Sequence, residues 1–143
     1  MLPFVADDGG RQNSGRRGSA DDCVVRALAI VAEYDYDAVY KDVAEAVYVA
    51  TGRRSARDGV PKKVRDRVYA NYGLVKLPRE FGRRPSLTEV ARKHPRAIVS
   101  TVRHVMAIVD GALHDTHDCR LSYMPDGTSH ERRAMSVLVT NNR

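Results

Sequence analysis

Long apolar runs are missing from this sequence, and so is an N-terminal export signal. No apolar run approaches the roughly 20 residues that a helix needs to cross a bilayer. The first residues, MLPFVADDGG, lack the basic-then-apolar order of a removable signal peptide. We therefore expect a protein of a reducing cytoplasm with no membrane partner.

Cysteine is scarce, with Cys23 and Cys119 the two in the chain. In a reducing cytoplasm a structural disulfide between them is not expected. Their spacing also matches none of the paired Cys-x-x-Cys patterns of zinc sites. The cysteine content favours neither a disulfide framework nor a zinc module, and no cofactor is expected.

A concentrated basic tract is also absent, although the formal net charge is +6. Acidic residues alternate with basic ones, as in KKVRDRV, and the scattering is typical of a solvated surface. The densest basic pairs lie far apart in the sequence: Arg16-Arg17, Arg53-Arg54, Lys62-Lys63, Arg83-Arg84 and Arg132-Arg133. Nucleic acid is therefore a weakly supported partner.

The chain of 143 residues fits a single domain, with residues 1–18 as a candidate flexible arm. Apolar residues at helical spacing then predict four helices, at residues 19–34, 37–50, 60–73 and 86–94. The expected N-caps of the first helix are Ser19, Asp21 or Asp22. The last carries a capping box, Ser86-x-x-Glu89.

The periodicity changes after Pro95 to short β-branched segments, while residues 74–85 read as irregular. Strands are expected at residues 96–102, 104–109, 112–118 and 134–140. Asp110-Gly111 between two apolar runs is a strong signal for a type I′ hairpin. Helices followed by an antiparallel sheet give an α+β fold.

The predicted hairpin places three polar side chains together. With a two-residue loop at 110–111, His104 lies opposite His117, and Asp115 lies on the same face. A histidine beside a carboxylate on the next strand can act as a general base with its orienting partner.

Cys23 falls in the first turn of its predicted helix, where the helix dipole and unpaired N–H groups favour a thiolate nucleophile. Cys23, His104 and Asp115 are therefore candidate catalytic residues. The alternative is structural: Cys23 is a small buried apolar side chain, and the histidines make ordinary hydrogen bonds.

A metal site is the main competing interpretation, because HDTHDC offers imidazole, carboxylate and thiol groups within six residues. Strand alternation separates His114 from His117, so one strand cannot present all of them to one ion. The best set would be His114 and Asp118, with Cys119, on the face away from His104. Clustered donors without a recognised spacing are common by chance, and no metal is expected.

The order of helix-start Cys23, strand-start His104 and Asp115 resembles the papain-like cysteine peptidase superfamily, which includes amidases, deamidases and transferases. Four stretches are more closely similar to a family of small bacteriophage and bacterial proteins. These are DDGGRQNSGRRGSADDCVVRALAI, YDAVY, SARDGVP and VRHVMAIVDGALHDTHDCR.

The resemblance implies a papain-like domain over residues 1–143 with Cys23 as nucleophile, His104 as base and Asp115 as orienting residue. His117 and Asp118 are the fallback orienting residues, and the oxyanion candidates are Gln12 and Asn13. The implied activity is that of a thiol hydrolase or acyl transferase, of peptidase, amidase or deamidase type. Its substrate would be a protein or peptide of the phage or its host. The alternative is a non-catalytic basic accessory protein that binds nucleic acid or a host protein.

Overall fold

The structure is a computed structural model that describes residues 1–16, 22–57, 59–79 and 82–141. Within these ranges the helices are η1 (Gln12–Ser14, a 3-10 turn), α1 (Cys23–Ala32), α2 (Tyr36–Thr51), α3 (Lys62–Asn71) and α4 (Leu87–Lys93). The strands are β1 (Phe4–Ala6), β2 (Leu74–Lys76), β3 (Ala97–Thr101), β4 (His104–Val109), β5 (Ala112–Asp115), β6 (Leu121–Tyr123), β7 (Ser129–Glu131) and β8 (Ser136–Thr140). Helices mostly precede strands, and the predicted α+β class is confirmed.

Six strands form the main sheet, in the order β1-β5-β4-β3-β8-β2, and β6 pairs with β7 in a separate two-stranded sheet. Every pair in the main sheet is antiparallel except β1 with β5, which is parallel. The strands of the C-terminal third pair antiparallel with one another, as the sequence predicts, and the parallel contact comes from the N-terminal β1. β1 and β2 lie outside the C-terminal third, and β2 falls in a segment expected to be irregular.

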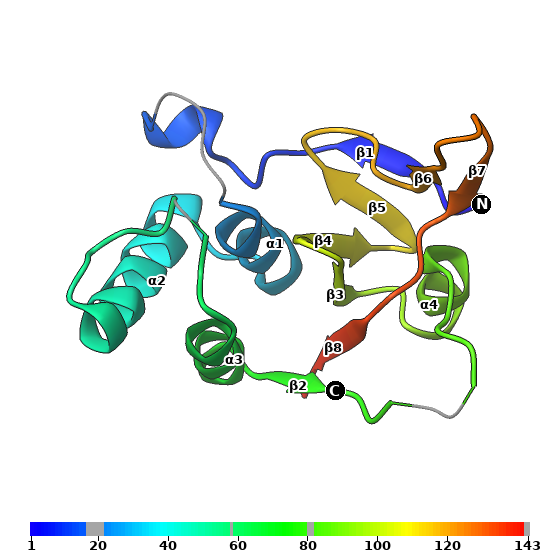
Figure 1. Cartoon of the computed structure of the whole chain (residues 1–143). Helices are drawn as coiled ribbons and strands as arrows, with labels where there is room; N and C mark the ends of the chain where they lie inside the picture. The colour runs from blue at the N-terminus through cyan, green and yellow to red at the C-terminus, as the bar shows by residue number, and fades with distance from the viewer. Residues whose placement is uncertain (17–21, 58, 80–81, 142–143) are drawn as a thin grey trace.

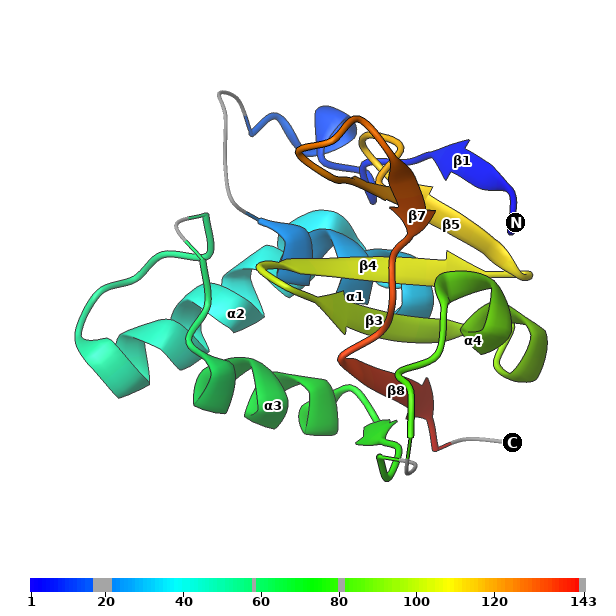
Figure 2. The ribbon, with the colours of Figure 1, turned by 45° about the vertical axis from the view of Figure 1, so that its right-hand side comes forward.

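Helices cover both faces of the main sheet (Figure 1). α1, α2 and α3 lie on one face, and α4 lies on the other, as the turned view also shows (Figure 2). β4 alternates between these layers, with Val105 and Ala107 packed in the α1 layer and Met106 and Ile108 in the α4 layer. Burial on both faces explains why β4 is apolar at nearly every position.

The β4–β5 hairpin forms as the sequence predicts. Asp110 and Gly111 have φ angles of 52° and 77°, as a type I′ turn requires, and Ile108 pairs with Leu113. β5 ends earlier than expected, at Asp115 instead of Asp118. The chain bends there because the Asp115 carboxylate accepts a hydrogen bond from the next backbone N–H, that of Thr116, at 2.7 Å.

α1 begins without the expected side-chain cap. Asp22 occupies the N-cap position, but its side chain makes no capping hydrogen bond. The carboxylate is turned inward, where it is buried and bound by Arg11, Arg26 and the Tyr36 hydroxyl. A buried carboxylate needs such partners, which outweigh one capping bond. The other expected caps, Ser19 and Asp21, lie outside the described residues, whereas the capping box of α4 is confirmed.

The N-terminal segment is packed against the domain, so residues 1–16 do not form the expected flexible arm. β1 pairs with β5, and the Leu2 N–H donates to Thr88 Oγ1 at 2.9 Å. Leu2 itself is 4% exposed and packs in the hydrophobic core between α4 and the sheet. The Gly-, Ser-, Arg- and Asp-rich composition that predicts a loop begins at residue 7, and residues 7–16 form turns and the short η1. Leu2 and β1 precede that stretch. Residues 17 and 18 lie outside the described residues.

None of the helices formed by the described residues is both long and apolar enough to pass through a bilayer.

Leu2→Ala should lower the free energy of unfolding by about 2–3 kcal/mol, because it leaves a cavity beneath α4. Val5→Ala is the matched control in the same segment, since Val5 is 41% exposed and fills no core position. It should cost less than about 1 kcal/mol. Urea unfolding followed by circular dichroism measures both, and equal small losses would show that the N-terminal segment does not contribute to the core.

Candidate active site

His104 begins β4 directly after a two-residue turn, in which Arg103 has a φ of 61°. Its side chain is 18% exposed, and its Nε2 lies 2.7 Å from Asp115 Oδ2. The predicted placement of His104 beside Asp115 is therefore confirmed. It follows from the hairpin register, which puts the two side chains on one face of neighbouring strands.

The Asp115 carboxylate is buried, with 3% of its side chain exposed, and both oxygens have partners. Oδ2 accepts from His104 and from the Cys119 thiol, whose Sγ is 3.3 Å away. Oδ1 accepts from the Thr116 N–H and lies 3.6 Å from the Arg26 guanidinium. Burial alone would raise the pKa of Asp115, but the hydrogen bond and charge of His104 outweigh it and lower this pKa. Asp115 is therefore an ionised, fixed partner for the imidazole.

The pKa of His104 moves in the opposite direction. Burial alone would lower it, but hydrogen bonds to Asp115, Cys119 and Cys23 raise the pKa from 6.5 to about 11. His104 is thus protonated at neutral pH. The thiol of Cys23 contributes to this rise in pKa, so it lies in the neighbourhood of the imidazole.

Cys23 is the first residue of α1 and is partly exposed. The space beside it is lined in part by Arg26, Met106 and Asp115, and it has no room for a water molecule. Small-molecule pockets usually enclose roughly 300–1,000 Å³, so the described residues form no such pocket at the thiol.

Arg26 is part of the site, although sequence reasoning missed it. Its guanidinium binds the buried Asp22 carboxylate and also approaches Asp115. The Tyr36 hydroxyl donates to Asp22, and burial followed by this hydrogen bond raises the pKa of Tyr36. The four-residue spacing of Asp22 and Arg26 was a usable signal for an ion pair on α1. Nothing in the sequence indicated that Arg26 also approaches Asp115.

Cys119 is the second residue that sequence reasoning did not place in the site. It is 3% exposed, and its Sγ lies 3.8 Å from Met106 Sδ in addition to its contact with Asp115. Burial raises the pKa of the Cys119 thiol, and Asp115 adds to this, although His104 acts in the opposite direction. Two thiols therefore lie near the His104 imidazole, and they differ in burial: Cys23 is partly exposed and Cys119 is buried.

The fallback and oxyanion candidates lie elsewhere or have other contacts. The exposed His117 packs its ring 5.6 Å from that of His104, whereas Asp118 forms an ion pair with Arg120. Gln12 and Asn13 lie exposed on η1. In the part of the chain that the structure describes, neither side chain is hydrogen-bonded to Cys23 or His104.

The metal set predicted on the outer face of the hairpin does not assemble. His114 Nδ1 lies 2.9 Å from Asp7 Oδ2, Asp118 binds Arg120, and the Cys119 thiol donates to Asp115. The prediction fails because β5 ends at Asp115, so strand alternation no longer governs the residues after it.

Comparisons with known proteins give no family assignment. No protein-family model, no curated protein and no solved structure matches the chain.

Asp115→Asn should lower the pKa of His104 from about 11 to near or below 6.5. The substitution keeps the shape of the side chain but removes its charge, so burial, which disfavours imidazolium, becomes dominant. Titration of the His104 ring resonances by NMR measures the change, with the exposed His130 as the reference signal. An unchanged His104 titration would mean that Asp115 does not control the imidazole.

The two cysteines should react differently with iodoacetamide at mildly acidic pH, where an ordinary thiol is almost wholly protonated. Cys23 is partly exposed to the reagent at the start of α1. Cys119 is buried next to a carboxylate. Mass mapping should find Cys23 labelled first in the folded protein.

Two histidine variants test whether His104 causes the faster labelling of Cys23. His104→Ala should slow the labelling of Cys23, whereas His130→Ala, at an exposed site on β7, should not. Unfolding should abolish the difference between the thiols. Faster labelling of Cys119 in the folded protein, or no effect of His104→Ala, would leave Cys23 as a packing residue.

Proposed function

We propose that the protein is a papain-like thiol hydrolase or acyl transferase that uses Cys23, His104 and Asp115. One observation carries the proposal: the His104 imidazole is held at 2.7 Å by the buried Asp115 carboxylate, in the neighbourhood of the thiol that begins α1. Nucleophile, base and orienting residue in this relation form the arrangement used for acyl transfer. The order of the three residues, with α1 before β4 and β5, also fits the papain-like resemblance.

In the proposed reaction Cys23 Sγ attacks the acyl carbon of an amide or related bond. Because His104 already holds a proton, Cys23 attacks as the thiolate of a thiolate–imidazolium pair, and His104 gives its proton to the departing amine, which leaves an acyl group on Cys23. A water molecule, losing its proton to His104, releases the acid and regenerates the thiol. In a transferase, an amine or hydroxyl of a second substrate replaces this water.

The electrostatics of the site favour this reaction. Asp115 stabilises the imidazolium form of His104, and an imidazolium beside Cys23 stabilises a thiolate. Asp115 is itself held by Arg26 and the Thr116 N–H, so the imidazole does not need to reorient during the reaction. Such preorganisation reduces the free energy required to reach the transition state.

The backbone N–H of Cys23, at the positive end of α1, is our candidate donor to the oxyanion. The Asp22 side chain does not cap this end of the helix, because it is turned toward Arg11 and Arg26. Gln12 and Asn13 remain only sequence candidates for a second donor, since the site geometry adds no contact in their favour.

A protein or peptide is the substrate class that we favour, because the thiol is partly exposed and has no preformed small-molecule pocket beside it. An extended chain can lie across the surface at Cys23. A phage-encoded enzyme acting on a host or phage protein agrees with the sequence resemblance. This assignment of substrate depends on the resemblance more than on the geometry.

The alternative of a nucleic-acid-binding accessory protein gains no support from the charge distribution. One member of each basic pair is bound to an oxygen of the protein itself. These members are Arg16, Arg54, Lys62, Arg83 and Arg133. A surface that interleaves both signs of charge attracts a polyanion weakly.

p-Nitrophenyl acetate tests the proposed chemistry without knowledge of the substrate. Wild-type protein should release nitrophenolate and carry an acetyl group on Cys23, identified by mass mapping. Cys23→Ala should remove the acetylated site, and His104→Ala should slow acylation by on the order of 10⁴-fold. Cys119→Ala, the matched cysteine control, should remain acetylated at Cys23. Acetylation spread over lysines, with no dependence on Cys23, would refute the proposal.

A further inference from the structure

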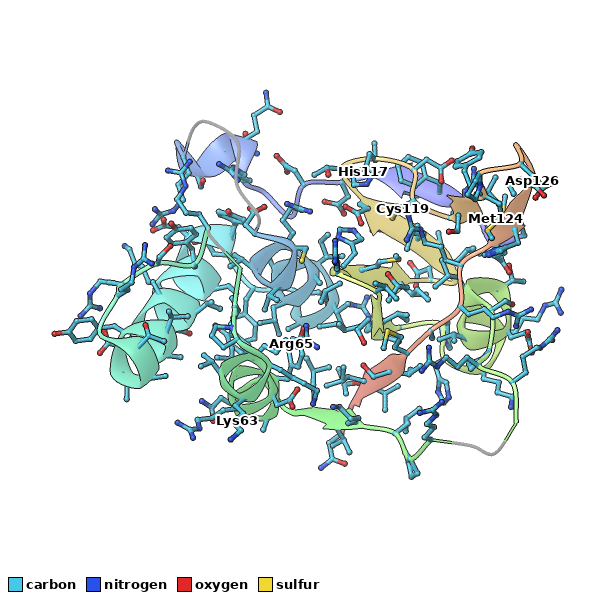
Figure 3. All side chains as sticks on the ribbon, in the orientation of Figure 1. Lys63, Arg65, His117, Cys119, Met124 and Asp126 are labelled. Carbon is cyan, nitrogen blue, oxygen red and sulfur yellow. The ribbon has the colours of Figure 1, made fainter. Side chains whose placement is uncertain are left out.

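We propose that the protein has a transition-metal site, of the zinc type, formed by His104, His117 and Cys119. One ligand atom from each of these residues lies within 4.8 Å of the other two. Figure 3 shows His117 and Cys119 beside β5, where the chain turns after Asp115. This set differs from the one that the sequence indicated, because it includes His104 and excludes His114 and Asp118.

The separations are close to those around a bound zinc ion. Zinc binds imidazole nitrogen at about 2.0–2.1 Å and thiolate sulfur at about 2.3 Å. Its tetrahedral ligand atoms are therefore about 3.3–3.6 Å apart, so ligand atoms that lie up to 4.8 Å apart must close by up to about 1.5 Å. His104 and Cys119 are fixed by Asp115, whereas His117 is exposed and its side chain can move inward.

The chemistry of the ligands selects the kind of ion. Two imidazoles and a thiolate suit zinc and similar transition metals, whereas magnesium and calcium prefer oxygen ligands. The Asp115 carboxylate touches His104 and Cys119 and supplies negative charge next to the cation, as carboxylates behind metal-bound histidines commonly do. Binding releases the Cys119 thiol proton and the imidazolium proton to solvent. The fourth coordination position is open to water.

Occupation of this site has a consequence for Cys23 that depends on the function proposed above. His104 cannot hold a metal ion and take the proton of Cys23 at the same time. A bound zinc ion therefore inhibits acyl transfer, and the metal and the substrate compete for one imidazole. The metal site itself does not depend on any reaction at Cys23.

Cobalt(II) gives a direct test, because it takes tetrahedral zinc sites and absorbs light when bound to thiolate. Tag-free protein, stripped with a chelator, should develop a thiolate-to-metal absorption band that saturates at one equivalent and disappears when zinc is added. Cys119→Ser should abolish the band. His117→Ala should weaken affinity more than about 100-fold, beyond the about 10–100-fold expected for loss of an outer partner, as in Asp115→Asn.

Two further variants make the result specific. His130→Ala removes an exposed histidine outside the cluster and should leave the affinity unchanged. Cys23→Ser removes the proposed nucleophile and should also leave the band in place, so a failed acylation experiment and a failed metal experiment are distinguishable. His117 is exposed, so His117→Ala should fold normally even if Cys119→Ser does not.

The proposal is overturned if cobalt gives no saturable band. It is also overturned if the band survives in Cys119→Ser, disappears in Cys23→Ser or is indifferent to His117→Ala. Each of these results would mean that other residues bind the metal ion, or that the protein does not bind it.

Discussion

The buried carboxylate of Asp115 is the interaction on which the site depends. It is bound by an imidazole from β4, a thiol from the segment after β5, the Thr116 backbone N–H and, at longer range, a guanidinium from α1. A charged oxygen away from water is tolerated only with such partners. Asp115 therefore determines the ionisation of His104 and the position of Cys119, and it ends β5 by bending the chain.

A chain of ion pairs connects this carboxylate to the start of α1. Arg26 lies between Asp115 and the buried Asp22, and Asp22 is held in turn by Arg11 and the Tyr36 hydroxyl. Asp22 directly precedes Cys23, so the same contacts position the thiol relative to the imidazole. The inward turn of Asp22, which leaves the helix without a side-chain cap, stabilises this connection.

His104 is shared by the two proposals made above. In the proposed function it acts with Cys23 in acyl transfer, and in the proposed metal site it binds an ion together with His117 and Cys119. The two cysteines differ because Cys23 is partly exposed at a helix start and Cys119 is buried against a carboxylate. Under these proposals a metal ion on the shared imidazole blocks acyl transfer without any change in the fold.

Local sequence determined the helices, the capping box at Ser86 and the hairpin that brings His104 to Asp115. These features depend on residues close together in the chain. Apolar periodicity distinguishes helices from strands, and the positive φ angles of Asp110-Gly111 favour one type of hairpin turn. Tertiary structure alone decided that β1 joins the sheet in parallel, that Arg26 reaches Asp115 and that Cys119 enters the site. Each of these depends on contacts between segments that local patterns do not relate: Leu2 fills a gap under α4, and the chain leaves strand geometry after Asp115. No periodicity describes such contacts, because burial and charge compensation in the packed molecule select them.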